Sequence, residues 1–138
     1  MMEHVLATVV VPVFNEEQVL EAFYARIAPV LDETFDGWEL LFVDDGSSDR
    51  SVAIMRSLHE QDTRVRALRL AKNVGSHLAL AAGLDHAEGD VVLILAADLQ
   101  DPPEVIPDFV ARWREGYEIV WGTRESRDDR PSHAGLSR

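Results

Sequence analysis

Strand-like and helix-like patterns alternate from the beginning of the chain. The run Val5–Val11 is nearly continuous and rich in β-branched residues, as in a strand buried on both faces, and we expect Pro12 to end it. From Glu16 onward the apolar residues recur at helical spacing. Pro29 is expected to kink this helix or to end it early.

The same alternation continues through the middle of the sequence. Leu40–Val43 predicts a second buried strand, and the apolar spacing of Ile54–Leu58 predicts a helix. Val65–Leu70 is a less regular strand candidate, because its two-residue period slips at Ala67–Leu68. A bulge would explain this slip, and so would a strand whose faces are covered unequally along its length.

The last part of the sequence predicts two more strands and two more helices. Ser76 is a plausible cap for the first helix. Val91–Leu95 is the most hydrophobic run and the best candidate for the central strand. Asp101 is expected to be the N-cap of the next helix, which Gly116 ends. A last strand is expected at Tyr117–Trp121.

These alternating patterns predict an open α/β sheet, mostly parallel, with right-handed crossovers and helices on both faces. In such sheets the ligand crevice lies beyond the carboxyl ends of the strands. Polar residues follow each predicted strand, so we expect them to converge at one edge of the sheet. These segments are 12–16, 44–46, 72–75, 97–101 and 122–124.

Composition narrows the classes of protein that fit this fold. The chain has 138 residues and a formal net charge of −12, from 25 acidic and 13 basic side chains. The acidic balance argues against a general nucleic-acid binder and against a broad anionic-membrane surface. Without cysteine, a disulfide framework, a thiolate zinc site and a cysteine nucleophile are excluded. Apolar runs fall short of the ~20 residues of a membrane span, and no basic secretory signal is present, so we expect a cytoplasmic protein.

Asp44 and Asp45 follow the second strand, where their side chains can enter the crevice. A carboxylate there can accept a hydrogen bond from a base N–H or a sugar hydroxyl. The structural alternative is equally plausible for an isolated Asp-Asp-Gly: one Asp caps the following helix and the other makes the turn. The residues alone leave both interpretations open.

Asp98 and Gln100 follow the most hydrophobic strand on a short loop. Such oxygen ligands suit Mg²⁺ or Mn²⁺ held by one or two carboxylates together with substrate phosphates. The capping role of Asp101 already explains that residue, whereas Asp98 and Gln100 have no local structural explanation. We therefore expect Asp98 to hold a metal or a diphosphate.

Several other site classes lack their motifs. The chain has no GxxxxGK[ST], GxGxxG, HExxH or GxSxG sequence, so P-loop, Rossmann dinucleotide, zincin and α/β-hydrolase sites are unsupported. A receiver-like domain would share Asp44–Asp45, but it needs a phosphoacceptor Asp after the third strand and a Lys after the fifth. The sequence offers Lys72–Asn73 and Thr123–Arg124 there instead.

Taken together and in order, the loops resemble those of family 2 glycosyltransferases with the GT-A fold. Over about residues 6–128 the resemblance is closest to the branch of dolichol-phosphate mannosyltransferases and bacterial polyprenyl-phosphate glycosyltransferases. The segments that carry it are Val11–Glu17, Val43–Asp49, Lys72–Gly75, Ala97–Glu104, Gly116–Val120 and Gly122–Arg124.

The resemblance implies a role for each matching residue. Asp98 and Gln100 would hold Mg²⁺ or Mn²⁺ on the donor diphosphate, which makes Asp98 the expected catalytic residue. Asp45 would bind the base, and Arg124 would approach the phosphates. The full set of expected donor-binding residues is Pro12, Phe14, Glu16, Asp44, Asp45, Lys72, Asn73, Gly75 and Arg124.

The implied reaction is inverting transfer of a sugar from a UDP- or GDP-sugar to a polyprenyl phosphate or a cell-envelope glycan. Residues 1–124 would be the nucleotide-sugar-binding region, and residues 125–138 a polar tail or the start of a truncated acceptor-side segment. The parent protein would then work at the cytoplasmic face of a membrane, and a homodimer is compatible with this hypothesis. Ala96 departs from the family pattern, because it stands where the metal motif usually has its first Asp. It motivates the alternative of a non-catalytic nucleotide-sugar-binding or scaffold module.

Overall fold

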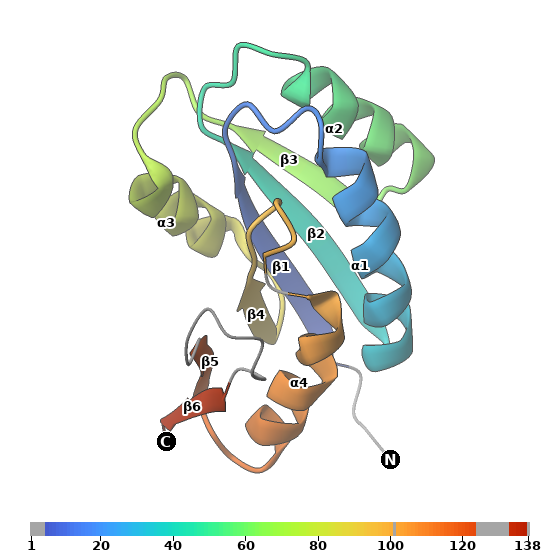
Figure 1. The fold of residues 1–138 in the computed structure, drawn as a ribbon, viewed down its shortest axis with the longest axis vertical. Coiled ribbons are helices and arrows are strands. Elements are labelled where there is room, and N and C mark those ends of the chain that lie inside the picture. The colour runs from blue at the N-terminus through green and yellow to red at the C-terminus, as the bar shows by residue number, and fades with distance from the viewer. Residues whose placement is uncertain (1–4, 101, 124–132, 138) are drawn as a thin grey trace. The chain divides into compact units, whose positions relative to one another are not determined.

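The larger part of the molecule is built around a four-stranded parallel sheet with strand order β3-β2-β1-β4 (Figure 1). The computed structural model describes residues 5–100, 102–123 and 133–137. It divides into two compact units, Met1–Pro102 and Pro103–Arg138, and the sheet belongs to the first. The elements of this first unit are β1 (Leu6–Val13), α1 (Leu20–Thr34), β2 (Gly37–Asp44), α2 (Ser51–Gln61), β3 (Val65–Arg69), α3 (Ser76–His86) and β4 (Val91–Ile94).

The strand order explains why helices cover both faces of the sheet. The chain steps from β1 to β2 to β3 in one direction, and α3 then returns it past β1 to β4. Right-handed crossovers therefore place α1 and α2 on one face and α3 on the other. Phe23 of α1 packs against Phe42 of β2, with ring centroids 6.1 Å apart. Ala79 of α3 packs instead against Leu41 and Val43, which point to the opposite face of β2. The predicted α/β class is confirmed.

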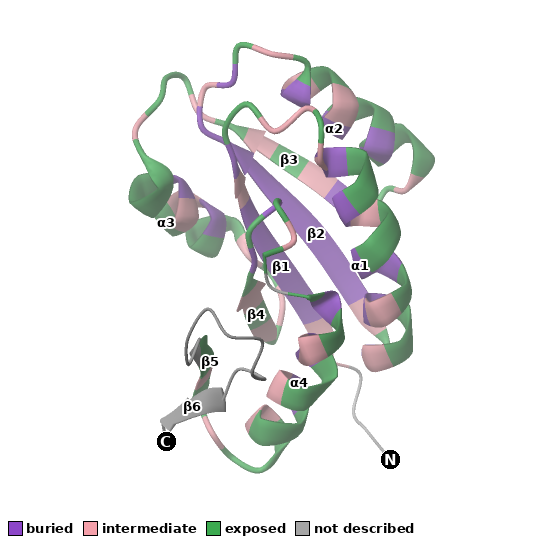
Figure 2. Cartoon of the chain, viewed as in Figure 1, coloured by how far each residue is buried: buried purple, intermediate pink, exposed green. Residues whose placement is uncertain are grey.

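The core is centred on β1 and β2 (Figure 2). Every residue of β2 from Trp38 to Asp44 is buried, as expected for a parallel strand covered on both faces. The run Val91–Leu95 was expected to be the central strand, and this prediction is wrong within the described residues. β4 pairs there only with β1, and its residues alternate between half-buried and exposed. High hydrophobicity indicates a strand, but it does not fix the position of that strand in the sheet.

Pro12 does not end the first strand, which continues to Val13. The carbonyl of Val13 accepts a hydrogen bond from Asp45 on the β2 side, and the carbonyl of Val10 accepts one from Leu95 on the β4 side. Alternate residues of a parallel strand bond to opposite neighbours, so the nitrogen of Pro12 faces the β4 side. The ladder to β4 ends at Val10, and no N–H is needed there.

The structure corrects two other local expectations and decides between the two explanations of the β3 pattern. Pro29 lies inside α1, which continues to Thr34. β3 keeps a continuous register with β2, so its irregular pattern reflects unequal covering and not a bulge. Ser76 is the first residue of α3, while Gly75 occupies the N-cap position with no side-chain cap. The expected cap Asp101 lies outside the described residues.

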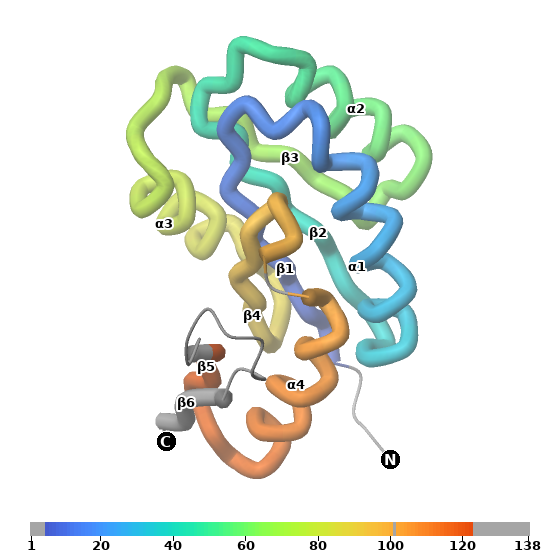
Figure 3. Tube along the Cα trace, viewed as in Figure 1, coloured from blue at the N-terminus to red at the C-terminus, as the bar shows by residue number. Residues whose placement is uncertain are grey.

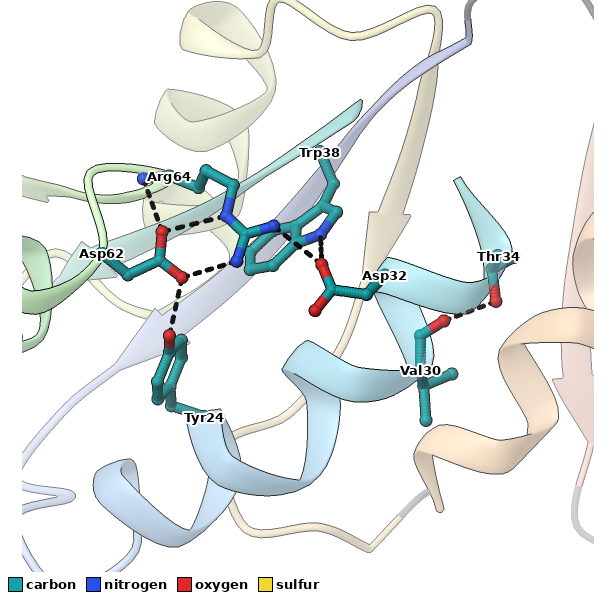
Figure 4. A network of polar contacts seen from close by, with 7 residues as sticks. All are labelled: Tyr24, Val30, Asp32, Thr34, Trp38, Asp62 and Arg64. Atoms are coloured by element: carbon teal, nitrogen blue, oxygen red, sulfur yellow. Dashed lines mark hydrogen bonds and ion pairs between the residues drawn. The ribbon is translucent and has the colours of Figure 1, made fainter. Parts of the chain in front are cut away.

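A network of charged and aromatic side chains lies near the amino-terminal ends of β2 and β3 (Figure 4). The guanidinium of Arg64 donates to both carboxylate oxygens of Asp62 and to Asp32, and it stacks 3.9 Å from the ring centroid of Trp38. The Tyr24 hydroxyl donates to Asp62 over 2.6 Å. The Arg64 guanidinium lowers the pKa of Asp62 to about 2. The network joins α1, β2 and the segment before β3, away from the carboxyl ends of the strands.

The second unit contains the segment η1 (Pro103–Val105), α4 (Ile106–Arg114), β5 (Ile119–Thr123) and β6 (His133–Ser137). β5 and β6 pair antiparallel. Gly116 follows α4 with φ +105°, which is the left-handed conformation expected of a residue that ends a helix. The strand expected at Tyr117–Trp121 begins and ends two residues later. The sequence patterns missed β6, because its residues His133–Ser137 show no apolar alternation.

Candidate functional site

The loops that follow β1, β2 and β3 gather at one end of the sheet, where the carboxyl ends of these parallel strands lie (Figure 3). β1 lies between β2 and β4. After β1 the chain first forms β2 and β3 on one side of it, and then forms β4 on the other side. This arrangement makes the carboxyl ends of β1 and β4 a topological switch point. Open α/β sheets bind ligands in the crevice at such a point.

Asn15 joins the loop after β1 to the loop after β2. Its φ of +51° is a left-handed conformation that Asn tolerates better than most residues. Its side-chain Oδ1 accepts hydrogen bonds from the backbone N–H groups of Ser48 and Asp49, at 2.9 and 3.3 Å. Its own N–H donates to the hydroxyl of Ser47 over 2.9 Å. The two loops therefore form one hydrogen-bonded unit.

Further hydrogen bonds between the same loops join the segment before α1 to the start of α2. The N–H of Glu17 donates to Asp49, and Glu17 accepts in return from the N–H of Arg50. The N–H of Glu16 donates to the hydroxyl of Ser51 over 2.9 Å. Burial favours a higher pKa for Asp49, but hydrogen bonds from Ser51 and Glu17 hold it below its usual value. Ser47, Asp49 and Ser51 are thus structural residues of the site that sequence reasoning missed.

Asp44 and Asp45 have different environments. Asp44 is completely buried, and its Oδ2 accepts from the N–H of Ser47 over 3.2 Å, as in a turn. Its Oδ1 is buried without a hydrogen-bond partner in the described part of the chain. Asp45 is 4% exposed and accepts from Val74 over 2.7 Å and from Gly75 over 3.0 Å. Asp44 thus has the turn role of the structural alternative, whereas Asp45 binds the N-terminus of α3 and not of α2.

The loop after β3 contributes Lys72, Asn73 and Gly75, all exposed. The side-chain amide of Asn73 donates to the backbone carbonyl of Asp45 over 3.1 Å. This loop passes so close to Gly46 that a Cβ there would lie 2.7 Å from the backbone nitrogen of Asn73. Glycine is therefore required at position 46, directly after the Asp pair.

The loop after β4 presents alternate residues to solvent. Ala96, Asp98 and Gln100 are exposed, whereas Leu95 and Ala97 are buried. Asp98 Oδ1 accepts from the N–H of Gln100 over 3.2 Å. Leu99 between them has φ +60°, an uncommon conformation for a residue with a side chain. Such backbone strain is often found at functional sites.

Glu16, in the loop after β1, has a raised pKa because of its position in this crevice. Burial raises its pKa, and the negative charges of Asp98 and Asp49 raise it further. The structure therefore brings the loops after β1 and β4 close enough for their carboxylates to repel each other. Phe14, in the same loop after β1, is 49% exposed, while Pro12 is half-buried. The other expected site residue, Arg124, lies outside the described residues.

The donor set at Asp98 suits a metal that arrives with a ligand of its own. Within the described ranges, no three His, Cys, Asp or Glu side chains come together as a metal-binding group. One carboxylate and one amide oxygen on a loop are too few for a resident metal site, but they suit Mg²⁺ or Mn²⁺ that also binds phosphate oxygens. The residues present therefore fit a substrate-borne divalent cation.

Comparison with known proteins places this architecture in a family. A family model described as "Glycosyl transferase family 2" matches residues 8–138. The uncharacterized glycosyltransferase YkcC of Bacillus subtilis is 44% identical over 92% of this chain and 39% of its own length. The undecaprenyl-phosphate 4-deoxy-4-formamido-L-arabinose transferase of Salmonella choleraesuis is 40% identical over 88% of this chain and 38% of its own length. The chain thus spans about two fifths of these relatives.

Solved structures show the same fold. The mannosyltransferase PcManGT from Pyrobaculum calidifontis, in complex with GDP-Man and Mn²⁺, superposes with a TM-score of 0.73 at 25% identity, covering 89% of this chain and 36% of its own. The S. aureus TarS 1–349 complex with UDP-GlcNAc gives 0.64 at 23%, covering 90% and 36%. The GT-A fold expected from the loop motifs is confirmed. None of the described helices is both long and apolar enough to cross a membrane.

Proposed function

Because the chain belongs to glycosyl transferase family 2, we propose that it is the nucleotide-sugar-binding part of an inverting glycosyltransferase. Its donor would be a UDP- or GDP-sugar and its acceptor a polyprenyl phosphate or a cell-envelope glycan. The observation that carries the proposal is the convergence of four loops at the β1/β4 switch point. The relatives support the donor and acceptor classes, since one is an undecaprenyl-phosphate 4-deoxy-4-formamido-L-arabinose transferase and the solved neighbours hold GDP-Man or UDP-GlcNAc.

The proposed donor site divides the molecule's loops by task. Pro12, Phe14 and Glu16 would line the nucleotide pocket, and Asp45 would accept from the base. Lys72, Asn73 and Gly75 would flank the donor, with Lys72 supplying a positive charge that offsets the phosphates. Asp44 would support the site indirectly, because its carboxylate accepts from the Ser47 N–H and so stabilises the turn after β2. Arg124 stays a predicted phosphate contact.

Asp98 and Gln100 would hold Mg²⁺ or Mn²⁺ against the donor diphosphate. When bound, the cation neutralises negative charge on the departing nucleoside diphosphate. An oxygen of the acceptor phosphate would attack the anomeric carbon from the face opposite to the nucleotide, and the bond from that carbon to the diphosphate oxygen would break. A phosphate oxygen is already ionised at neutral pH, so a polyprenyl-phosphate acceptor needs no separate general base.

The second candidate is a non-catalytic nucleotide-sugar-binding or scaffold module. Ala96 favours it, because this exposed position offers no carboxylate beside Asp98. The active hypothesis instead assigns the metal to Asp98, Gln100 and the diphosphate. The two differ in whether divalent metal strengthens donor binding.

Calorimetric titration of the chain with UDP-GlcNAc and GDP-mannose, each with and without Mn²⁺, tests these proposals. We expect one donor to bind, and Mn²⁺ to strengthen its binding. Asp98→Ala should reduce the Mn²⁺ effect on the order of tenfold or more, because it removes the only carboxylate of the proposed cation site. Glu60→Ala, which removes an exposed acid from α2, is the matched control and should leave the effect unchanged.

Two other outcomes of the titration would contradict the active hypothesis. Binding that is indifferent to Mn²⁺ in the unchanged chain would favour the scaffold module. Failure of both donors to bind would exclude both candidate functions for these two nucleotides.

A further inference from the structure

The loop after β3 covers the acidic group that is proposed to recognise the base. We call residues 70–75 the strap. Its Val74 N–H donates to Asp45 Oδ1 over 2.7 Å, and its Gly75 N–H donates to Asp45 Oδ2 over 3.0 Å. The Asn73 side chain donates to the Asp45 carbonyl. Both carboxylate oxygens are thus engaged by the strap, and Asp45 is only 4% exposed.

This geometry conflicts with direct contact between Asp45 and a base. A carboxylate recognises a base by accepting its N–H, so the base must reach an oxygen of that carboxylate. A purine or pyrimidine ring cannot reach a side chain that is almost fully covered. The strap must therefore move before any base can contact Asp45.

We propose that the strap is a latch over the base pocket, closed by Asp45 in the free protein and opened when a nucleotide binds. The inference rests on the proposed function, and it deepens the account of how that site recognises its donor. The N–H of the base replaces the Val74 and Gly75 N–H groups on the Asp45 carboxylate, so one acidic group either closes the pocket or reads the base. A base with a ring N–H donor, such as uracil or guanine, can make this exchange.

The strap has the local structure that such a movement needs. Gly75 has φ +96°, and the space beside its Cα is open, since a Cβ added there would meet no atom within 4 Å. Lys72 and Asn73 are exposed. On the Asp45 side, the close backbone approach at Gly46 sets the closed position without a side chain between the loops. Backbone bonds tie the two ends of the strap, from the Leu70 N–H to the Asp44 carbonyl and from the Ala79 N–H to the Gly75 carbonyl. Between these ends, the bonds from Val74, Gly75 and Asn73 to Asp45 favour closure.

Amide hydrogen exchange, measured by NMR, tests the latch on the whole chain. In the free protein we expect the Val74 and Gly75 amides to be protected, because each donates to a buried carboxylate. Saturating UDP or GDP with Mn²⁺ should reduce this protection by about tenfold, since a hydrogen bond to a charged group is lost. Amides in β1 should stay as they are, which serves as the internal control.

The outcomes separate the latch from the proposed function. If calorimetry shows that UDP or GDP binds while Val74 and Gly75 keep their protection, the latch is wrong and the donor site stands. If neither nucleotide binds, the proposed function fails, and the latch fails with it.

A variant addresses the closed state without any nucleotide. Asp45→Asn replaces one acceptor oxygen by an NH₂ group, so we expect faster exchange of Val74 or Gly75 by about tenfold in the free protein. Asp36→Asn, in an exposed turn, is the control and should leave both amides unchanged. Unchanged exchange in folded Asp45→Asn would overturn the latch. If that variant does not fold, the wild-type nucleotide experiment still decides the matter.

Discussion

At the scale of single residues, the site combines carboxylates with different tasks. Asp44 builds a turn, Asp45 holds the strap, and Asp49 joins the segment before α1 to the start of α2. Glu16, which is half-buried, and Asp98, which is exposed, repel each other across the β1/β4 crevice. A bound cation would relieve this repulsion, which is the electrostatic reason for placing it there.

Glu16 gives a prediction about pH. Its raised pKa means that folding disfavours the ionised carboxylate. The ionised Glu16 therefore lowers the free energy of unfolding at pH values above its pKa in the folded protein, and this loss is absent below its pKa in the unfolded chain. Glu16→Gln should therefore raise Tm at pH 7, by about 1–3 °C. The gain should disappear as the pH falls below about 4, the ordinary pKa of Glu.

Thermal unfolding followed by circular dichroism between pH 4 and pH 7 makes this measurement. Glu60→Gln is the control, because Glu60 is exposed on α2 and should show no such pH-dependent gain. A Glu16→Gln variant that is less stable than the parent at pH 7 would show that the carboxylate has a favourable partner.

Sequence reasoning reached the candidate residues but not the bonds between them. Turn chemistry marked the segment after β2, yet its Ser47, Asp49 and Ser51 bond to residues 15–17, more than 30 positions away in the chain. No local pattern encodes such a pairing. The hydrogen bonds from the Val74 and Gly75 N–H groups to Asp45 could not be predicted for the same reason.

At the scale of elements, a second polar network seals the turn between α3 and β4. The buried Glu39 accepts from Thr8 and from the N–H of Glu88, and it pairs with Arg66 over 2.8 Å. Burial alone would raise the pKa of Glu39, but these hydrogen bonds hold it below its usual value. The N–H of Gly89 donates to Thr8 over 2.9 Å, which seats the turn directly on β1.

Gly89 is therefore predicted to be intolerant of a side chain. A Cβ there would lie 2.7 Å from the backbone nitrogen of Thr8 and 2.8 Å from the carbonyl oxygen of Leu6. Because these contacts are with backbone, Gly89→Ala should destabilise the fold by about 1–3 kcal/mol, as overpacking does. Urea unfolding measures this loss.

Gly37→Ala is the matched control for that measurement. Its added Cβ would meet only Leu6 Cδ1, at an ordinary 3.6 Å. We expect it to change the free energy of unfolding much less than Gly89→Ala does. Equal stability of the two variants would contradict the close packing of the α3–β4 turn on β1.

The elements themselves were largely predictable, because two apolar periods of different length alternate along the chain. The helix faces followed from the right-handed crossover rule. The patterns could not predict the order of the strands in the sheet. Val91–Leu95 was expected to be the central strand, but β4 lies at the edge of the described sheet. Pro12 likewise looked like a strand end, because its missing N–H matters only if a neighbouring strand needs it.

At the scale of the whole molecule, family and fold are shown while activity is a proposal. The chain has the sheet and loops to which the proposal assigns the donor, and it spans 39% of one relative and 38% of another. The predicted functional regions 1–124 and 125–138 remain a hypothesis. The structure has two compact units, which meet in sequence between Pro102 and Pro103. The net charge of −12 fits a site that concentrates carboxylates where a cation and a nucleotide would bind.

The central claim is that the nucleotide and its cation bind at the β1/β4 switch point. Paramagnetic Mn²⁺ tests it directly, because it broadens the NMR signals of nearby amides. With UDP or GDP present, we predict broadening of residues 98–100 and 15–17, and none at residues 87–90 at the other end of β4. Broadening at residues 87–90, or no Mn²⁺ effect on the switch point while the nucleotide is bound, would contradict the account.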